Sequence, residues 1–127
     1  MTNSPGCSAC RDGKGLDFPI SMAFQPIVDV TRRQVFAHEA LVRGINGESA
    51  GSLLAKVTTE NLYAFDQSCR IKAVELAARL QVPAMVSINF MPNAVYQAET
   101  CIRATLEAAQ RFSLPLDKII FEVTEQE

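Results

Sequence analysis

The stretch AMVSINF at residues 84–90 indicates the fold class, because it is a short apolar strand between two segments with helical periodicity. Residues 60–80 repeat apolar side chains at helical spacing, and residues 98–112 do so again. A further apolar run at residues 118–123 is predicted to be another strand. Strands that alternate with helices in this way are typical of an α/β fold with parallel strands and helices packed outside the sheet.

Each of the two helices is expected to bury one stripe of apolar side chains. Thr58 or Thr59 is available as the cap of the first helix. Its inward stripe is predicted to consist of Leu62, Phe65, Cys69, Ala73, Leu76 and Leu80. The second helix is predicted to place three residues inward, namely Ile102, Leu106 and Ala109.

Two more strands are predicted upstream of these helices. Residues 22–30 and residues 34–42 have strand character, and the polar turn at residues 31–33 joins them as an antiparallel hairpin. Pro26 restricts the first strand to a sheet edge or to an irregular strand. A short helix is predicted at residues 52–57. Four strands are too few for a closed (β/α)₈ barrel, which needs about 250 residues, so we expect a partial barrel.

The composition is that of an ordinary globular domain. Hydrophobic residues make up 48% of the 127 residues and charged residues 20%. The net charge of −2 provides no basic field that would draw the whole chain to a nucleic acid polymer or to an anionic membrane. No apolar run approaches the ~20 residues of a membrane span, and residues 1–14 lack the apolar core of a signal peptide. We therefore expect a cytoplasmic location.

Residues 1–16 are polar and rich in glycine, and we expect them to be a flexible N-terminal segment that precedes a domain at residues 17–127. Cys7 and Cys10 form a C-x-x-C within this segment, a spacing that suits half of a zinc site or a redox pair. A zinc site would need two more ligands, and the sequence has no second C-x-x-C and no H-x-x-x-H. The alternative interpretation is a flexible tail with two exposed thiols.

Three polar side chains are predicted to lie on the face of the sheet that is turned away from the helices. Successive side chains of a strand point to opposite faces, and this alternation separates Glu39, Asn89 and Glu122 from their apolar neighbours. Two carboxylates and an amide that converge on one interior are suitable ligands for a hard cation such as Mg²⁺ or Mn²⁺. The alternative is that each carboxylate is paired separately in the core or exposed at the end of its strand.

Two further polar residues lie on the second strand. Arg43 follows Glu39 by four residues on the same face, ~13 Å further along the strand. A metal ligand and a guanidinium at that separation suit a ligand with two phosphates, whereas a solvated arginine at a strand end is the other interpretation. His38 faces the helices, so we interpret it as a core histidine rather than a catalytic base.

Four motifs resemble the successive motifs of EAL domains, in the same order and at similar spacing. They are FQPIVD at residues 24–29, EALVRG at residues 39–44, SINFMPN at residues 87–93 and FEVTE at residues 121–125. A single E-A-L tripeptide carries no signal, but four motifs in order do. The resemblance extends over nearly the whole chain from Leu16 onward.

The resemblance implies a fold and an activity. EAL domains form a modified TIM barrel whose first strand runs antiparallel, and this chain resembles the N-terminal half of such a barrel. The family hydrolyses cyclic di-GMP, a bacterial second messenger, to linear pGpG with two divalent metal ions. Two such ions can activate a water molecule and stabilise an in-line displacement at phosphorus. We therefore expect Mg²⁺ or Mn²⁺ as the cofactor and cyclic di-GMP as the ligand.

The resemblance also implies roles for individual residues. Glu39 is implied to be catalytic as well as a metal ligand. Gln25 and Arg43 are implied to contact the substrate. Glu125 is implied to be a catalytic residue that steadies a loop absent from these 127 residues. The implied metal ligands are Glu39, Asn89 and Glu122.

The later motifs of EAL domains, among them a pair of aspartates and a lysine, are absent from this sequence. We therefore expect the complete domain to be a phosphodiesterase and the 127 residues alone to be inactive. The alternative is a non-catalytic module that binds cyclic di-GMP or another protein and dimerises through its open half barrel. An open apolar sheet edge would recruit a second copy or a complementary half domain.

Overall fold

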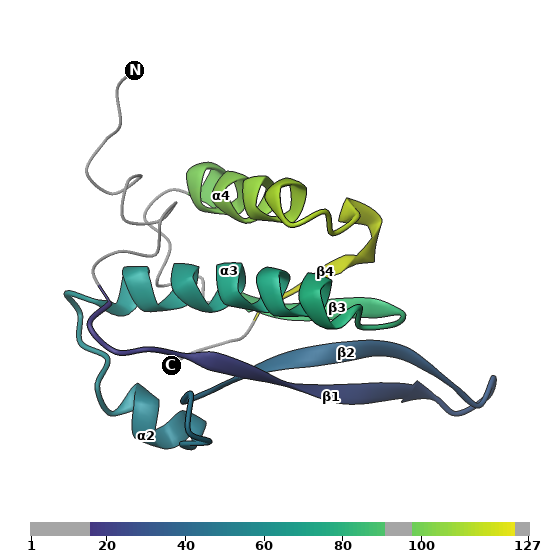
Figure 1. Cartoon of the computed structure of the whole chain (residues 1–127), viewed down its shortest axis with the longest axis horizontal. Helices are drawn as coiled ribbons and strands as arrows, with labels where there is room; N and C mark the ends of the chain where they lie inside the picture. The colour runs from purple at the N-terminus through teal and green to yellow at the C-terminus, as the bar shows by residue number, and fades with distance from the viewer. Residues whose placement is uncertain (1–15, 91–97, 124–127) are drawn as a thin grey trace.

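The centre of the protein is a four-stranded sheet in which the strands follow the chain order β1-β2-β3-β4. The structure is a computed structural model and describes residues 16–90 and 98–123. One long helix, α3, lies along a face of the sheet, and a second, α4, packs beside α3 (Figure 1). Buried residues of both helices share one core with the strands, so the architecture is a sheet with helices on one side.

The sheet opens with an antiparallel hairpin and continues with parallel strands, as the sequence predicts. β1 (Ser21–Asp29) pairs antiparallel with β2 (Gln34–Arg43). β2 then pairs parallel with β3 (Met85–Phe90), and β3 pairs parallel with β4 (Ile119–Val123). The expectation of a mixed α/β fold with four strands and an opening hairpin is confirmed.

Pro26 has the effect on β1 that its chemistry predicts. β1 is at one end of the strand order, and its register with β2 shifts between Ile27 and Val28, directly after the proline. Proline has no N–H group to donate to a neighbouring strand, so it is confined to edges and bulges. The β1 edge is therefore interrupted in its middle, which is a common way to protect an edge strand.

The helices are α2 (Ala50–Leu54), α3 (Leu62–Leu80) and α4 (Ala98–Arg111), and a short 3₁₀ turn, η2, covers Leu116–Lys118. None of the described helices combines the length and the apolar character needed to cross a bilayer. α2 lies near the carboxyl end of β2 (Figure 1). The sheet and α3 thus enclose most of the interior, and α2 borders one end of it.

The start of α3 differs from the prediction of a helix that begins at residue 60 behind a threonine cap. The Thr58 Oγ1 accepts hydrogen bonds from the backbone N–H groups of Glu60 and Asn61, and the Thr58 N–H donates to Asn61 Oδ1 at 2.6 Å. These bonds close a separate turn, so Thr58 does not cap the helix and α3 begins at Leu62. Side chains of this kind often bond to local backbone groups in place of the helix.

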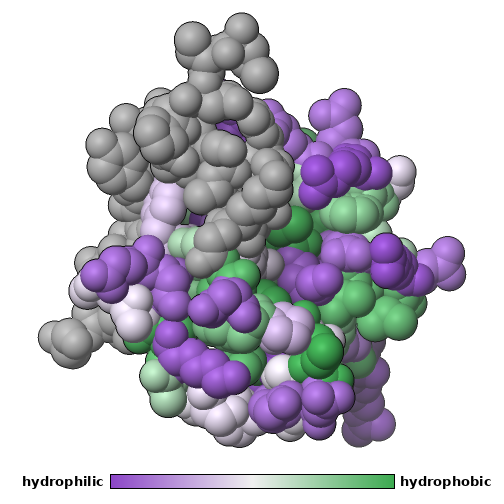
Figure 2. All heavy atoms as spheres, turned by 60° about the vertical axis from the view of Figure 1, so that its left-hand side comes forward, coloured by the Kyte–Doolittle hydropathy of each residue, from purple (hydrophilic) through white to green (hydrophobic). Residues whose placement is uncertain are grey.

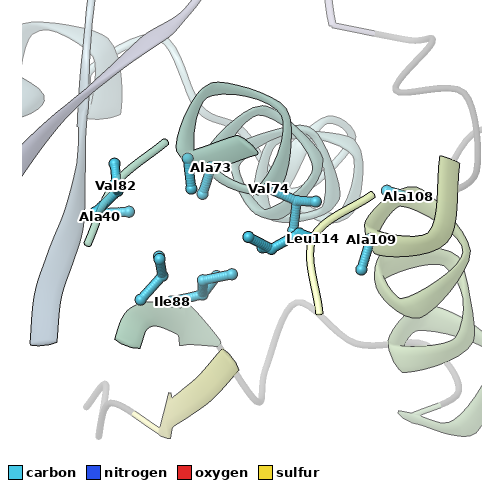
Figure 3. Close-up of a cluster of buried hydrophobic side chains, with 10 residues drawn as sticks. Ala40, Ala73, Val74, Val82, Ile88, Ala108, Ala109 and Leu114 are labelled. Carbon is cyan, nitrogen blue, oxygen red and sulfur yellow. The ribbon is translucent and has the colours of Figure 1, made fainter. Parts of the chain in front are cut away.

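The core lies between the sheet and the two helices (Figure 3). Small residues dominate its helical side, which allows the helices to approach the sheet closely. The cluster consists of Ala40, Ala73, Val74, Ala77, Val82, Val86, Ile88, Ala108, Ala109 and Leu114. A second cluster joins Ile20, Leu53 and Phe65, with Leu16 and Phe18 packed against it. The described part of the fold therefore begins with Leu16, which packs against this second cluster.

The buried stripes of the helices are only partly as predicted. On α3, Phe65 and Ala73 are buried, but Leu80 is 64% exposed. The reason is that α3 contacts the sheet on one side and α4 on another, so its buried face is wider and includes Val74. On α4, Ala109 is fully buried, as expected, whereas Ile102 and Leu106 are half-buried.

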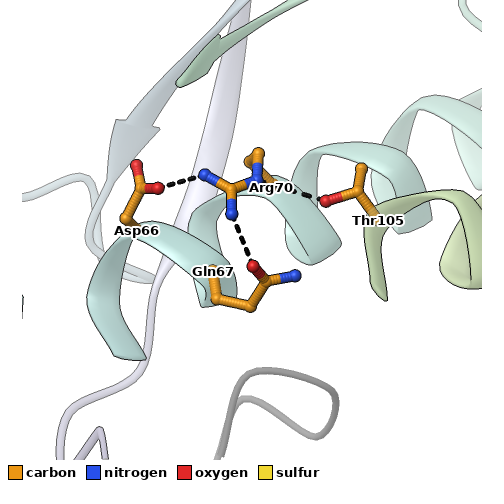
Figure 4. Close-up of polar contacts among 4 residues, drawn as sticks. All are labelled: Asp66, Gln67, Arg70 and Thr105. Atoms are coloured by element: carbon orange, nitrogen blue, oxygen red, sulfur yellow. Dashed lines mark hydrogen bonds and ion pairs between the residues drawn. The ribbon is translucent and has the colours of Figure 1, made fainter. Parts of the chain in front are cut away.

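A buried arginine joins α3 to α4 (Figure 4). Arg70 is 1% exposed, and its guanidinium bonds to Asp66 and Gln67 on its own helix and donates to Thr105 Oγ1 of α4 at 3.1 Å. It also lies 4.6 Å from the centre of the Phe90 ring, at the end of β3. The three polar partners and the aromatic ring satisfy a charge that would otherwise be costly to bury.

We predict that Arg70→Met destabilises the protein by about 3 kcal/mol or more, because Asp66 then loses the guanidinium that offsets its buried charge. The matched control is Arg79→Met. Arg79 pairs with Glu75 at 2.9 Å on the same helix but is 67% exposed, so its loss should change the free energy of unfolding by less than about 0.5 kcal/mol. Urea unfolding of both variants measures the difference, and equal effects would contradict this role of the buried pair.

Candidate functional site

Five polar side chains share the face of the sheet that is turned away from the helices. In the pairing register, Gln25 of β1 lies opposite Glu39 of β2, and Glu39 lies opposite Ser87 of β3. One pleat further along, Asn89 of β3 lies opposite Glu122 of β4. Paired residues of neighbouring strands, and residues two apart on one strand, point to the same face. The register therefore gathers all five on one surface.

The opposite face carries the apolar residues that alternate with them. Ala40, Val86 and Ile88 belong to the core cluster beneath α3. Phe90, the neighbour of Asn89, is buried on the same side as these residues, where the Arg70 guanidinium lies over its ring. The alternation that the sequence predicts for β2 and β3 is thus what the structure shows.

Hydrogen bonds link each carboxylate of this surface to β3. The Asn89 Nδ2 donates to Glu39 Oε2 at 3.2 Å and to the Ala40 carbonyl oxygen at 3.4 Å. The Ser87 Oγ donates to Glu122 Oε1 at 2.8 Å. Ser87 is buried, Glu39 and Asn89 are half-buried, and Glu122 is exposed. β3 therefore orients both carboxylates from its position between them.

The donors on this surface fit a hard divalent cation. Glu39 and Glu122 offer carboxylate oxygens, and Asn89 offers an amide oxygen, which are the ligand types that Mg²⁺ and Mn²⁺ prefer. In the structure, the amide nitrogen of Asn89 faces Glu39, and its N–H group partly offsets the carboxylate charge. Within residues 16–90 and 98–123, no three His, Cys, Asp or Glu side chains come together as they would around a metal ion. The described residues thus supply two carboxylates and one amide toward such a site.

Arg43 is half-buried at the carboxyl end of β2. Its Nη1 donates to the Val42 carbonyl oxygen at 2.7 Å. Arg43 also lines a pocket of about 280 Å³ at the carboxyl ends of β2 and β3, where parallel sheets commonly place their active sites. The other lining residues are Met22, Ala40, Leu41, Val42, Ala50, Leu54, Phe65, Asp66, Cys69, Ala73, Ile88 and Asn89.

Figure 2 turns this end of the molecule toward the viewer. Apolar side chains gather near the middle of the described surface, and hydrophilic side chains surround them. A pocket with mainly apolar walls and a few convergent polar groups is the usual form of a small-molecule site. Asn89 is the residue common to the pocket and to the carboxylate surface.

Other residues singled out from the sequence have varied outcomes. The His38 Nδ1 lies 3.1 Å from the Pro83 carbonyl oxygen, and because a carbonyl only accepts, this nitrogen donates. His38 thus has a structural bond to the loop before β3, but it is half-buried and belongs to neither core cluster, so the interpretation as a core histidine is only partly met. Cys7, Cys10 and Glu125 lie outside the described residues, so their predicted roles stay predictions.

Sequence reasoning missed the bond between Ser87 and Glu122 and the buried group around Arg70. A signal for the first was present, since a serine is an uncommon residue in a central strand. A signal for the second was the spacing of Asp66 and Arg70, which places opposite charges one helical turn apart. Neither pattern by itself distinguishes a buried pair from an exposed one.

A family model matches most of the chain. The model described as "EAL domain" matches residues 18–127. Among curated proteins, the blue light- and temperature-regulated antirepressor BluF of Escherichia coli (strain K12) is 27% identical over 106 residues. That match covers 83% of this chain and 26% of BluF.

Two solved structures are similar in both fold and sequence. A standalone versatile EAL protein from Vibrio cholerae O395, in its cyclic di-GMP-bound form, is 54% identical with a TM-score of 0.83. The match covers 89% of this chain and 48% of that one. Klebsiella pneumoniae BlrP1 in a manganese and cyclic di-GMP complex at pH 9.0 is 28% identical with a TM-score of 0.76, covering 88% of this chain and 28% of BlrP1. This chain thus spans about half of the first protein and little more than a quarter of the second.

The pKa of Cys69, whose thiol-bearing side chain lines the pocket, is also perturbed. Desolvation raises the pKa of Cys69 well above its ordinary value, the charge of Asp66 adds to this effect, and Arg70 opposes it. A raised pKa in the folded state means that the folded protein keeps a proton that the unfolded chain loses. The resulting stabilisation is present below the ordinary thiol pKa of about 8.5 and is lost as the pH rises above it.

We therefore predict that the free energy of unfolding falls above about pH 8.5, with a contribution from Cys69 of up to about 1.4 kcal/mol per pH unit. Cys69→Ala removes this contribution. The difference in free energy of unfolding between the parent protein and the variant should therefore narrow or reverse between pH 7 and pH 10. Urea unfolding at several pH values measures it. A gap that stays constant over this range would show that the thiol of Cys69 titrates in the folded protein as it does in the unfolded chain.

Proposed function

Because this chain belongs to the EAL domain family, we propose that it forms part of a cyclic di-GMP phosphodiesterase site. The observation that carries the proposal is the shared surface of Glu39, Asn89 and Glu122, on which Asn89 bonds to one carboxylate and lies opposite the other. The cyclic di-GMP-bound Vibrio cholerae structure and the manganese complex of BlrP1 support this choice of ligand and of cofactor class.

In this proposal, Glu39, Asn89 and Glu122 hold a divalent cation, Mg²⁺ or Mn²⁺, with their oxygen atoms. Such a cation, once bound, polarises the phosphodiester and lowers the pKa of a bound water. The resemblance to EAL domains implies that Glu39 is the catalytic ligand, and it lies between Gln25 and Asn89 on the polar surface. The two carboxylates also keep the surface negative until the cation neutralises it, which disfavours anion binding without metal.

In this proposal, Gln25 and Arg43 contact the substrate. Gln25 is exposed and lies beside Glu39 in the register, so its amide can donate to an oxygen of a ligand at that surface. Arg43 follows Glu39 on the same strand and offers the paired N–H groups that suit a phosphate. Glu125, which lies outside the described residues, is proposed to steady a catalytic loop from the remainder of an EAL domain.

The variant that tests this function is Glu39→Gln in a complete EAL domain that carries this sequence. The amide has nearly the same shape but lacks the charge that attracts a cation, so hydrolysis of cyclic di-GMP to pGpG should fall at least about a hundredfold. The fold should survive, because Glu39 is only half-buried and its partner Asn89 can bond to a carboxamide. Product chromatography measures the activity, and thermal unfolding measures the fold.

The matched control is Glu107→Gln, which removes the same charge from the exposed side of α4 and should leave hydrolysis unchanged. The 127-residue chain alone is expected to form no pGpG, because the described surface supplies only part of a two-metal site. A Glu39→Gln domain that hydrolyses cyclic di-GMP at close to the normal rate would contradict the proposed function.

A second candidate function, as an interaction module that self-associates, is favoured by the β4 edge. Among the described strands, β4 has a neighbour on one side only, and it has neither the proline nor the bulge that interrupts β1. Val123 at its end is 66% exposed. An uninterrupted strand edge of this kind is a template for pairing with another chain.

We predict that the 127-residue chain sediments as dimers or larger species at about 10 µM and that Val123→Lys weakens this association at least about tenfold, because a charge blocks edge pairing. Leu80→Lys is the matched control, since Leu80 is 64% exposed on α3, away from either sheet edge. Sedimentation velocity over a concentration series compares the three proteins. A monomer at all concentrations would contradict self-association through this edge.

A further inference from the structure

Ser87 is an unusual residue for its position. It is 3% exposed on β3, the inner strand between β2 and β4, and its register partners are Glu39 on one side and Ile120 on the other. Inner strands favour β-branched and aromatic residues, and a small hydroxyl residue contributes little packing there. A buried hydroxyl is also costly unless it has a hydrogen-bond partner. The identity of the partner therefore indicates what the serine does.

That partner is an exposed side chain rather than a buried one. The Ser87 Oγ donates to Glu122 Oε1 at 2.8 Å, although Glu122 itself faces solvent. An exposed carboxylate can be solvated by water, so it does not need this bond to tolerate its charge. What the bond changes is the freedom of the side chain, because a free glutamate samples several rotamers and loses that entropy when it is fixed. Ser87 thus fixes one oxygen of Glu122 in advance.

We propose that Ser87 is a positioning residue that holds Oε1 of Glu122 and presents Oε2 to the divalent cation, and that it thereby favours Mg²⁺ and Mn²⁺ over Ca²⁺. The inference rests on the proposed function, in which Glu122 is a metal ligand. Mg²⁺ requires near-ideal octahedral geometry with short bonds, which suits one oxygen from each carboxylate. Ca²⁺ accepts more ligands and often takes both oxygens of a carboxylate, and one of these is already engaged by Ser87.

The position of Asn89 agrees with this assignment. Asn89 lies two residues after Ser87 on the same face and directly opposite Glu122. Its Nδ2 donates to Glu39 Oε2, so β3 contributes one orienting hydrogen bond to each of the two carboxylates. Groups that orient metal ligands typically change metal affinity 10–100-fold when they are removed. Ser87 is therefore expected to have a measurable effect without touching the cation.

The test titrates the 127-residue chain with Mn²⁺ alone and follows paramagnetic line broadening in its NMR spectrum. In the parent chain, the side-chain amide of Asn89 and the backbone amides of Glu39 and Glu122 should broaden first. Ser87→Ala should raise the Mn²⁺ concentration at half broadening roughly tenfold. Ca²⁺ added to the Mn²⁺-bound protein displaces Mn²⁺ and restores the broadened NMR signals. Ser87→Ala should lower the ratio of Ca²⁺ to Mn²⁺ at which half of the signal intensity returns. Ser87→Thr keeps the hydroxyl and should behave as the parent does.

Ser87→Cys provides a second route if alanine disturbs the fold, because a thiol has a similar shape but is a weak donor. A Glu122→Ala background separates positioning from general support of the fold. There, Ser87→Ala should cause no further change in Mn²⁺ affinity, since the carboxylate on which Ser87 acts is gone. A further tenfold loss in that background would show that Ser87 does not act through Glu122 and would overturn the inference.

The outcomes also distinguish this inference from the proposed function. If no residue of the polar surface broadens in the parent chain at millimolar Mn²⁺, the role of Ser87 in this chain is overturned, whereas the proposed function is decided separately by hydrolysis in the complete domain with Glu39→Gln. If the parent binds Mn²⁺ and the alanine and cysteine variants match it in both affinity and Ca²⁺ competition, the role of Ser87 alone is overturned. A tenfold loss in these variants with rescue by threonine supports the inference.

Discussion

The register of β3 between its two neighbours is the constraint on which the candidate site depends. Side chains alternate across a sheet, so a slip of one residue would move Asn89 to the helix side and Ile88 to the polar surface. Burial of Val86 and Ile88 beneath α3 prevents this slip. Each such side chain contributes about 1.5–3 kcal/mol when it is fully buried. The apolar face of β3 therefore determines the position of the polar face.

The helical layer extends this control to the ends of the strands. The guanidinium of Arg70 lies over the Phe90 ring, and Phe90 meets Phe121 edge to face with ring centres 6.0 Å apart. These two aromatic residues directly follow Asn89 and directly precede Glu122 in the sequence. Contacts on the helix side thus hold the backbone from which the polar residues project. The buried group around Arg70 contributes to the site through packing, without a residue of its own on the polar surface.

Much of this arrangement could be predicted from the sequence, because it follows from a period of two. Placing Glu39, Asn89 and Glu122 on one face required only the strand boundaries and the alternation of apolar residues. The start of α3 could not be found in the same way. Thr58 is a residue type that often caps helices, but its hydroxyl bonds within a separate turn. The exposure of Leu80 and the burial of Arg70 depend on where α4 packs, which local periodicity does not contain. The chemical roles of Gln25 and Arg43 likewise stay predictions, because a shared surface does not identify a ligand.

Crystals of a complete EAL domain that carries this sequence, grown with Mn²⁺ and cyclic di-GMP, test the central claim most directly. Anomalous scattering locates Mn²⁺ without reference to any assumed ligand. The account predicts an anomalous peak about 2.0–2.2 Å from oxygens of Glu39, Asn89 and Glu122, typical of divalent-cation bonds to oxygen. A peak bound elsewhere, with Glu39 and Glu122 directed away from each other, would contradict it.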